Sequence, residues 1–285
     1  MSFYALAWIS TIAWGVYSFV GKLTSKYAIS NPWMFNFVVN LFLLIFLIPT
    51  ALYFGVGFPI EWRFLTLAAV SNAFWFFLYT YSLYRLDVSV LTPLFNFRSV
   101  FAVLLGGIFL GESLTSFQFL MFIVICIAGM FVSIEEDLNI RSFFNKNVAI
   151  CILGMFFLAL QGMFTNLTQQ TNGTWETTLF MTLLTVLFMA PSIAFFKKDL
   201  KRVSAKNVSP LVLMALISVV GTVTSFEAYK SSLGITSLIL AIPISMILAF
   251  AFSVAKPSLL ENHSIKVYAI RFFATIVMIG AALAM

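Results

Sequence analysis

The chain has 285 residues, of which 62% are hydrophobic and only 9% are charged. A soluble domain carries about 25% charged residues, so this composition excludes an ordinary soluble fold and makes lipid the solvent for most of the chain. The net charge of +6 does not indicate nucleic-acid binding, because the 16 basic residues are scattered between apolar runs and cluster only at 197–206. Long apolar runs, without the alternating segments of about 10 residues that a barrel requires, predict transmembrane helices.

Apolar segments of about 20 residues, each long enough to cross a bilayer, follow one another along the chain. The first has no basic residues before it and continues to Val20, so we expect a first span and not a cleaved signal peptide. The connections are too short to be domains, which places function in or between the helices. The expected spans are 3–21, 33–55, 64–84, 88–110, 117–134, 147–165, 177–196, 210–230, 234–255 and 265–284.

The prolines indicate an internal repeat. Three pairs recur at offsets of 142, 151 and 150, namely Pro49 with Pro191, Pro59 with Pro210, and Pro93 with Pro243. We therefore expect an all-α integral membrane protein of ten transmembrane helices, built from two five-helix repeats at 1–140 and 146–285. Because five is odd, tandem copies lie in opposite orientations, and such inverted repeats are typical of secondary transporters with a midplane site. The alternative is a duplicated membrane scaffold.

Basic residues in the connections predict the orientation, because cytoplasmic loops are enriched in Lys and Arg. Twelve lie on one side of the expected bundle and two, Arg63 and Lys230, lie on the other. The sequence thus predicts a multi-pass protein of the plasma or inner membrane with both termini non-cytoplasmic.

One stretch, from Tyr81 to Ser133, has a short turn before Ser89, Pro93 within the fourth span, and Leu110-Gly111-Glu112 at the end of that span. With Ala13-Trp14-Gly15 in the first span, it resembles the EamA module of the drug/metabolite transporter superfamily. The resemblance implies two EamA-like repeats and a carrier of small metabolites. It also implies a central cavity formed mainly by the first, third, fourth, sixth, eighth and ninth helices. Better-known ten-helix members have cytoplasmic termini, the reverse of the orientation predicted here.

Arg98 is the most informative single residue, since it falls near the middle of the fourth span. An Arg at that depth costs at least ~2.5 kcal/mol on insertion scales, so it should face a cavity or a partner. Pro93 deprives the Ser89 carbonyl of its helical donor, and Asn96 adds an amide in the same turn. These features predict a helix break and a substrate site; a structural strut that is salt-bridged to another helix is the alternative. Pro243 predicts the matching break in the ninth span.

The third span presents Asn72, Trp75 and Tyr79 at spacings of three and four, which places them on one helix face. This face would stack and hydrogen-bond a small polar solute, or it is ordinary packing with aromatic filler. Trp14 in the first span and Gln161 in the sixth are lesser candidates.

In the eighth span, Thr224 and Glu227 share a face. An intramembrane carboxylate relays protons, binds an ammonium group or neutralises Arg98; the alternative is a headgroup-level pair with Lys230. Arg271 is expected to snorkel to the cytoplasmic surface and is left out of the site.

Catalytic and metal-binding patterns are missing from the sequence. The single histidine, His263, lies away from both cysteines, and no glycine-rich phosphate loop occurs. We therefore expect no enzyme activity, cofactor or metal. The predicted function is secondary transport by alternating access of a small polar metabolite, with an amino acid or organic acid favoured, and a proton or ion as coupling partner. A passive channel or lipid scramblase and a scaffold without transport are the alternatives, and both monomer and homodimer stay open.

Overall fold

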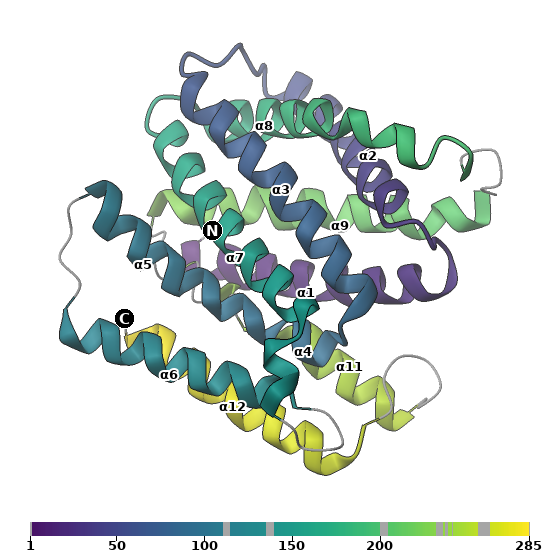
Figure 1. Ribbon diagram of the computed structural model, residues 1–285. Helices are drawn as coiled ribbons and strands as arrows, with labels where there is room; N and C mark the ends of the chain where they lie inside the picture. Colours follow the sequence, from purple (N-terminus) through teal and green to yellow (C-terminus); the bar gives the residue numbers. More distant parts are fainter. Residues whose placement is uncertain are drawn as a thin grey trace.

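The computed structural model describes residues 2–110, 115–134, 140–199, 205–231, 236, 239–240, 242–255 and 263–284. Within these ranges every regular element is a helix (Figure 1). Eight helical segments of the described chain are long and apolar enough to cross a membrane, and α6 and α11 are shorter apolar helices. The elements are α1 (Phe3–Tyr27), α2 (Pro32–Tyr53), α3 (Arg63–Arg85), α4 (Val88–Leu91), η1 (Pro93–Asn96), α5 (Phe97–Leu110), α6 (Ser116–Val132), η2 (Ile140–Phe144), α7 (Lys146–Gln169), α8 (Thr174–Met189), η3 (Ala190–Phe195), α9 (Ala205–Ser231), α11 (Ile244–Ala255) and α12 (Ile265–Ala284). The helical membrane fold predicted from the sequence is confirmed.

Polar residues fix where several helices begin. Ser2 and Asn145 each accept a hydrogen bond from a backbone N–H of the first turn, and Thr115 forms a reciprocal capping box with Gln118. The predicted break in the fourth span is present, since α4 gives way at Pro93 to the 3-10 turn η1 before α5 begins. In the ninth span, α11 begins directly after Pro243.

The helices pack in pairs that join the two halves of the chain. α1 lies along α9 and α3 along α7, and these contacts form the centre of the bundle. α2 contacts both α8 and α9, α3 also contacts α8, and α5 contacts α7 while α1 contacts α11. α6 and α12 lie side by side at one edge of the molecule (Figure 1). Both termini lie on the same side of the bundle, at the left of that view.

Two loop asparagines tie the halves together at the ends of the bundle. Asn31, before α2, donates from Nδ2 to Oδ2 of Asp199 at 2.7 Å, in the segment that follows α8. Asn172, before α8, accepts from the backbone N–H groups of Ile60 and Glu61 at 2.9 and 3.0 Å and donates to the Glu61 carbonyl at 2.9 Å. Each asparagine thus holds the loop that precedes the third helix of the other half.

Arg271 does not snorkel, so this expectation from the sequence was wrong. Its side chain is completely buried, with Nε and Nη2 donating to the Ile134 carbonyl at 3.2 and 2.9 Å and Nη1 donating to the Ser89 hydroxyl. The end of α6 lies over α12 at this depth and provides the acceptor that water was expected to supply. A buried guanidinium needs such partners to offset its desolvation.

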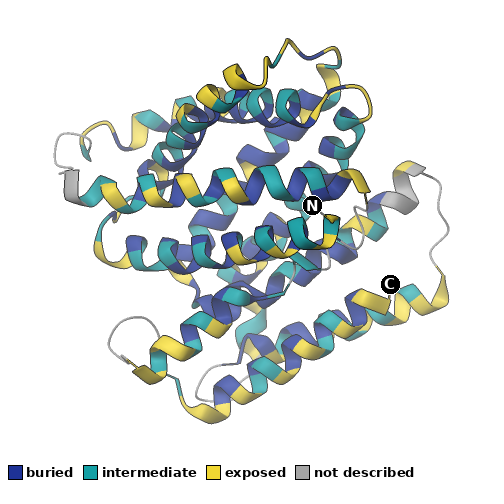
Figure 2. Cartoon of the chain, turned by 180° about the vertical axis from the view of Figure 1, so that it is seen from behind, coloured by how far each residue is buried: buried dark blue, intermediate teal, exposed yellow. Residues whose placement is uncertain are grey.

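The outer surface of the bundle is apolar. Exposed large hydrophobic residues include Ile45, Leu52, Phe74 and Phe273, and exposed positions run along the outward faces of the helices (Figure 2). In water such a surface would be an interaction or aggregation site, whereas in a bilayer it meets lipid chains. The exposed apolar surface and the hydropathy of the sequence therefore both indicate that lipid surrounds the bundle.

Gly15 allows α1 to approach α11 closely at Ile244. A Cβ at Gly15 would lie 2.6 Å from the Ile244 Cβ, whereas one at Gly280 would meet nothing within 4 Å. We expect Gly15→Ala to lower the free energy of unfolding by about 1–3 kcal/mol through overpacking. Gly280→Ala, the matched control, should leave it unchanged or raise it by about 0.5–1 kcal/mol through helix propensity. Thermal unfolding of the detergent-solubilised variants measures both, and equal stabilities would contradict the packing described here.

Candidate functional site

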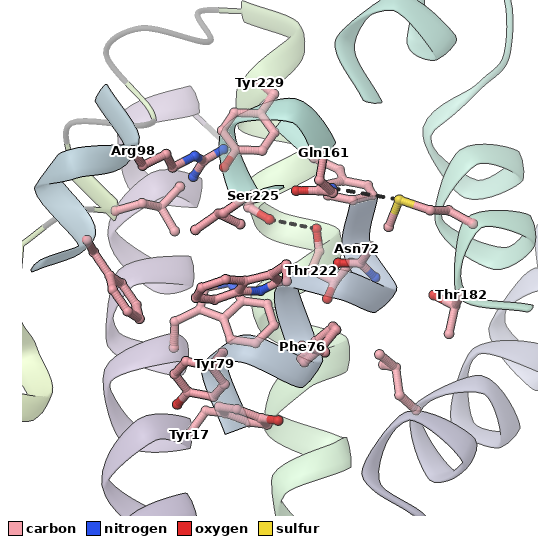
Figure 3. Close-up of a pocket in the computed structure, with 18 of the residues that line it drawn as sticks. Tyr17, Asn72, Phe76, Tyr79, Arg98, Gln161, Thr182, Thr222, Ser225 and Tyr229 are labelled. Atoms are coloured by element: carbon pink, nitrogen blue, oxygen red, sulfur yellow. Dashed lines mark hydrogen bonds between the residues drawn. The ribbon is translucent and has the colours of Figure 1, made fainter. Parts of the chain in front are cut away.

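A cavity of about 110 Å³ lies between the two halves of the bundle. Most of its lining residues come from α1, α3 and α9, and η1, α5, α7, α2, α8 and Leu240 contribute one or two residues each (Figure 3). The helices implied by the family resemblance thus all contribute. On α9 the lining residues run from Thr222 to Tyr229, near the end of that helix at Ser231, so the cavity extends toward the side of the bundle where the termini lie.

Aromatic rings form one wall of the cavity. The Trp14 and Tyr17 rings meet edge to face with centroids 5.3 Å apart, and Tyr17 lies 6.3 Å from Tyr79. Trp75 lies 5.0 Å from Tyr79 and 5.6 Å from Phe95. These separations are those of interacting aromatic pairs, so the rings support one another and present a rigid apolar surface.

Arg98 provides the charge of the site. Its side chain is only 9% exposed and lies at the start of α5, directly after the helix break. Its Cζ lies 5.4 Å from the centroid of the Tyr229 ring (Figure 3). Among the described residues it has neither an ion-pair partner nor a hydrogen bond, and every other described lining residue is uncharged. A buried cation of this kind favours an anionic ligand, because a ligand charge would offset its desolvation.

Two amide side chains turn acceptors toward the cavity. Asn72 donates from Nδ2 to the Thr185 hydroxyl at 3.2 Å, and Gln161 donates from Nε2 to the Thr165 hydroxyl at 2.9 Å. Because their nitrogens are held by the protein, their carbonyl oxygens are the ends left for a ligand. The site therefore combines one cation with two hydrogen-bond acceptors and an aromatic wall.

The structure brings together six of the residues predicted from the sequence. Trp14, Asn72, Trp75, Tyr79, Arg98 and Gln161 all line the cavity. Asn96 does not; it is fully buried, donates to the Pro93 carbonyl at 2.8 Å, and has no partner for its Oδ1 among the described residues. It stabilises the break rather than the cavity wall.

Thr224 and Glu227 lie away from the cavity. The Glu227 carboxylate pairs with Lys230 at 3.2 Å, and both side chains are more than one-third exposed. This is the headgroup-level pair left open by the sequence. Thr224 donates to the Val220 carbonyl within its own helix.

Several residues that line the cavity were not predicted from the sequence, among them Tyr17, Phe95, Ser225 and Tyr229. Ser225 and Tyr229 are spaced by four on α9, so helical periodicity would have placed them on one face. In a chain with 34 Phe and 9 Tyr, however, an aromatic residue at such spacing has little specificity.

The fold and cavity define a polytopic helical membrane protein with a solute-sized site between its halves. Residues 1–134, just under half of the chain, match the EamA-like transporter family, and this match supports the EamA-type transporter predicted from the sequence. This family is not a family of enzymes. No curated protein matches the chain.

Solved structures share the fold. One crystal structure, described only as that of a protein, has a TM-score of 0.65 at 13% sequence identity, and the match covers 98% of this chain and 94% of the other. At this identity the likeness establishes the fold alone.

The close approach of Gly162 to Arg98 provides a test of the site. A Cβ at Gly162 would lie 2.7 Å from Arg98 Nη2, the mobile end of a long side chain, so Gly162→Ala should fold but displace the guanidinium. We expect affinity for small carboxylates to fall about tenfold, equivalent to about 1.4 kcal/mol. Isothermal titration with a carboxylate panel measures this, with Gly280→Ala as the control. Unchanged affinity for every bound carboxylate would remove Arg98 from the binding site.

Proposed function

We propose that the protein is a secondary transporter that moves a small polar metabolite, an amino acid or an organic acid, by alternating access. The observation that carries this proposal is Arg98, a buried cation that faces the cavity and has no acidic partner among the described residues. An arginine with a purely structural role would form an ion pair with a neighbouring helix. An arginine that binds a ligand keeps its guanidinium donors free for that ligand.

The chemistry of the cavity supports this substrate class. A carboxylate fits the Arg98 guanidinium, which forms strong charge-assisted hydrogen bonds with carboxylates. The carbonyl oxygens of Asn72 and Gln161 would accept from an ammonium or hydroxyl group, and the aromatic wall would cover an apolar portion of the molecule.

The helix contacts support two inverted repeats at 1–140 and 146–285. If α1, α2, α3, α5 and α6 correspond to α7, α8, α9, α11 and α12, each contact has a partner: α1–α9 with α3–α7, α2–α9 with α3–α8, and α1–α11 with α5–α7. The contacts α2–α8 and α6–α12 are their own partners. A two-fold axis that exchanges the halves produces this pattern.

The asparagine ties support the same symmetry. Asn31 and Asn172 are 141 residues apart. They lie one and two residues before the second helix of their proposed repeats, and each forms hydrogen bonds with the other repeat. Because an odd number of spans separates them, the two ties belong to opposite ends of the bundle. Inverted repeats that rock about a midplane site alternate access between the two sides.

The loops also support the predicted orientation. Described basic residues of the larger group, including Lys26, Arg85, Arg141 and Lys197, lie at the end of the bundle opposite the termini. We place this basic face in the cytoplasm and both termini outside.

Transport by variants of Arg98 and of Glu227 tests the proposed function. In proteoliposomes preloaded with amino acids, organic acids and sugars, we expect saturable counterflow of one class. Arg98→Gln should raise the half-saturating concentration roughly 10- to 100-fold, as expected for loss of a charge-assisted interaction of about 1.5–3 kcal/mol. Glu227→Gln, which removes an exposed pair of small energetic value, should change it less than about twofold.

The alternatives predict other results. A channel or scramblase would give flux without saturation or counterflow. A scaffold would give no flux with any cargo and would tolerate Arg98→Gln in its folding and assembly. Saturable counterflow that is equally strong in Arg98→Gln would contradict the assigned role of Arg98.

A further inference from the structure

An ionisable contact closes the bundle at its basic face. His263 Nε2 lies 2.7 Å from Asp87 Oδ2, across 176 positions of sequence. Asp87 lies in the turn between α3 and α4, and His263 lies two residues before α12. The contact therefore joins the first proposed repeat to the second.

Other polar contacts converge on the same segment. Ser89, two residues after Asp87, accepts from Arg271 of α12, so α4 is tied to α12 at two levels. Lys22 of α1 donates to the carbonyls of Leu83 and Leu86 at 2.9 and 2.6 Å and holds the end of α3. α4 leads directly into the break at Pro93 and then to Arg98, so the contact adjoins the element that carries the charge of the site.

Hydrogen bonds link α1 and α3 between this contact and the cavity. Tyr79 donates to the Ser18 hydroxyl at 3.0 Å at the cavity wall, and Lys22 lies one turn of α1 beyond Ser18. These hydrogen bonds join α1 to α3 between the cavity wall and the Asp87–His263 contact.

Electrostatics favour the charged form of Asp87. Burial opposes its ionisation, yet the hydrogen bond from His263 and the charges of His263, Arg271 and Lys22 outweigh burial and lower the pKa of Asp87. Asp87 therefore stays ionised in the physiological range, and histidine is the side chain type whose charge changes most readily in that range. Tyr268 of α12 also faces His263, with ring centroids 5.9 Å apart, but a phenol does not titrate in this range.

The opposite end of the bundle has no ionisable counterpart in sequence. The position 150 residues after Asp87 is Ser237, and the position 149 residues before His263 is Leu114. These offsets are those of Pro93 with Pro243 and of the starts of α6 and α12. The Asp87–His263 contact thus departs from the symmetry of the two proposed repeats.

We propose that Asp87 and His263 form a proton-binding latch, which holds the basic face closed when the imidazole is protonated and releases it when the proton leaves. The inference rests on the proposed alternating-access function. It assigns the coupling proton to the gate at the basic face rather than to the substrate cavity.

The sign of the pH effect follows from the charges. With the imidazole protonated, the latch is an imidazolium–carboxylate pair, which favours the closed state. With the imidazole neutral, a hydrogen bond to the Asp87 carboxylate remains, but the attraction between opposite charges is lost. Asp87 itself would lose its charge only in strong acid, below its ordinary pKa of about 4. Raising the pH from 6 to 8.5 therefore favours opening of the basic face.

The experiment measures the conformation directly. Spin labels are placed at Arg85 and Lys266, two exposed positions on α3 and α12, with Cys126 replaced by Ala, and distances are recorded in nanodiscs at pH 6 and 8.5. We expect the ratio of long- to short-distance populations to rise about fivefold, the effect of a coupling of about 1 kcal/mol. His263→Gln, which retains a neutral donor, should abolish the pH dependence. Asp87→Asn, which removes the charge of the carboxylate, should also abolish the pH dependence of the distances.

The outcomes separate this inference from the proposed function. A native distance distribution that does not change with pH, or a change that survives in His263→Gln, would overturn the latch even if saturable counterflow is observed. If the distances respond to pH and lose the response in both variants, the latch is supported. Absence of counterflow for every cargo would then count against the transport function and not against the proton-sensitive contact.

Discussion

The structure depends on placing one charge, the guanidinium of Arg98, at the centre of an apolar bundle. An unpaired Arg in a continuous lipid-facing helix would be costly, so its position requires a cavity on one side and a supporting frame around it. The break at Pro93 and η1 sets the start of α5 beside α7, where Gly162 leaves room for the guanidinium. The Tyr229 ring then covers part of the charge. Cavity, break and glycine serve the same requirement.

The two buried arginines show how the fold separates structure from binding. Arg271 is fully satisfied by the Ile134 carbonyl and the Ser89 hydroxyl, which fix α12 against α4 and α6. Arg98 meets a ring and a cavity instead. A saturated guanidinium holds helices together, whereas one with donors left over attracts a ligand. Both flank the broken segment from α4 to η1, so movement of that segment would act on the site and on the basic face together.

Most of the helical architecture could be predicted from the sequence, because lipid imposes long apolar runs and proline imposes breaks. Pro93 alone predicts the break in the fourth span, and the cost of an arginine at mid-depth predicts that Arg98 faces a cavity. The partners of the polar residues could not be predicted in the same way. Arg271 looked close enough to water to snorkel, and only the arrangement of α6 over α12 shows that a carbonyl replaces water there. The Asp87–His263 contact spans 176 positions, and no local pattern links its members.

Near-symmetry explains why such a small asymmetry has consequences. If the repeats were identical, the inward- and outward-open states of a rocking carrier would have equal free energy, and gradients of solute alone would set direction. In the proposed carrier, matched helix contacts and paired asparagine ties would bring the two states close to that balance. Against this background a single contact worth about 1 kcal/mol changes the ratio of states about fivefold. Under the proposed mechanism, the Asp87–His263 pair at the basic face would therefore be sufficient to make the resting state depend on pH, without any acidic residue among the described residues that line the cavity.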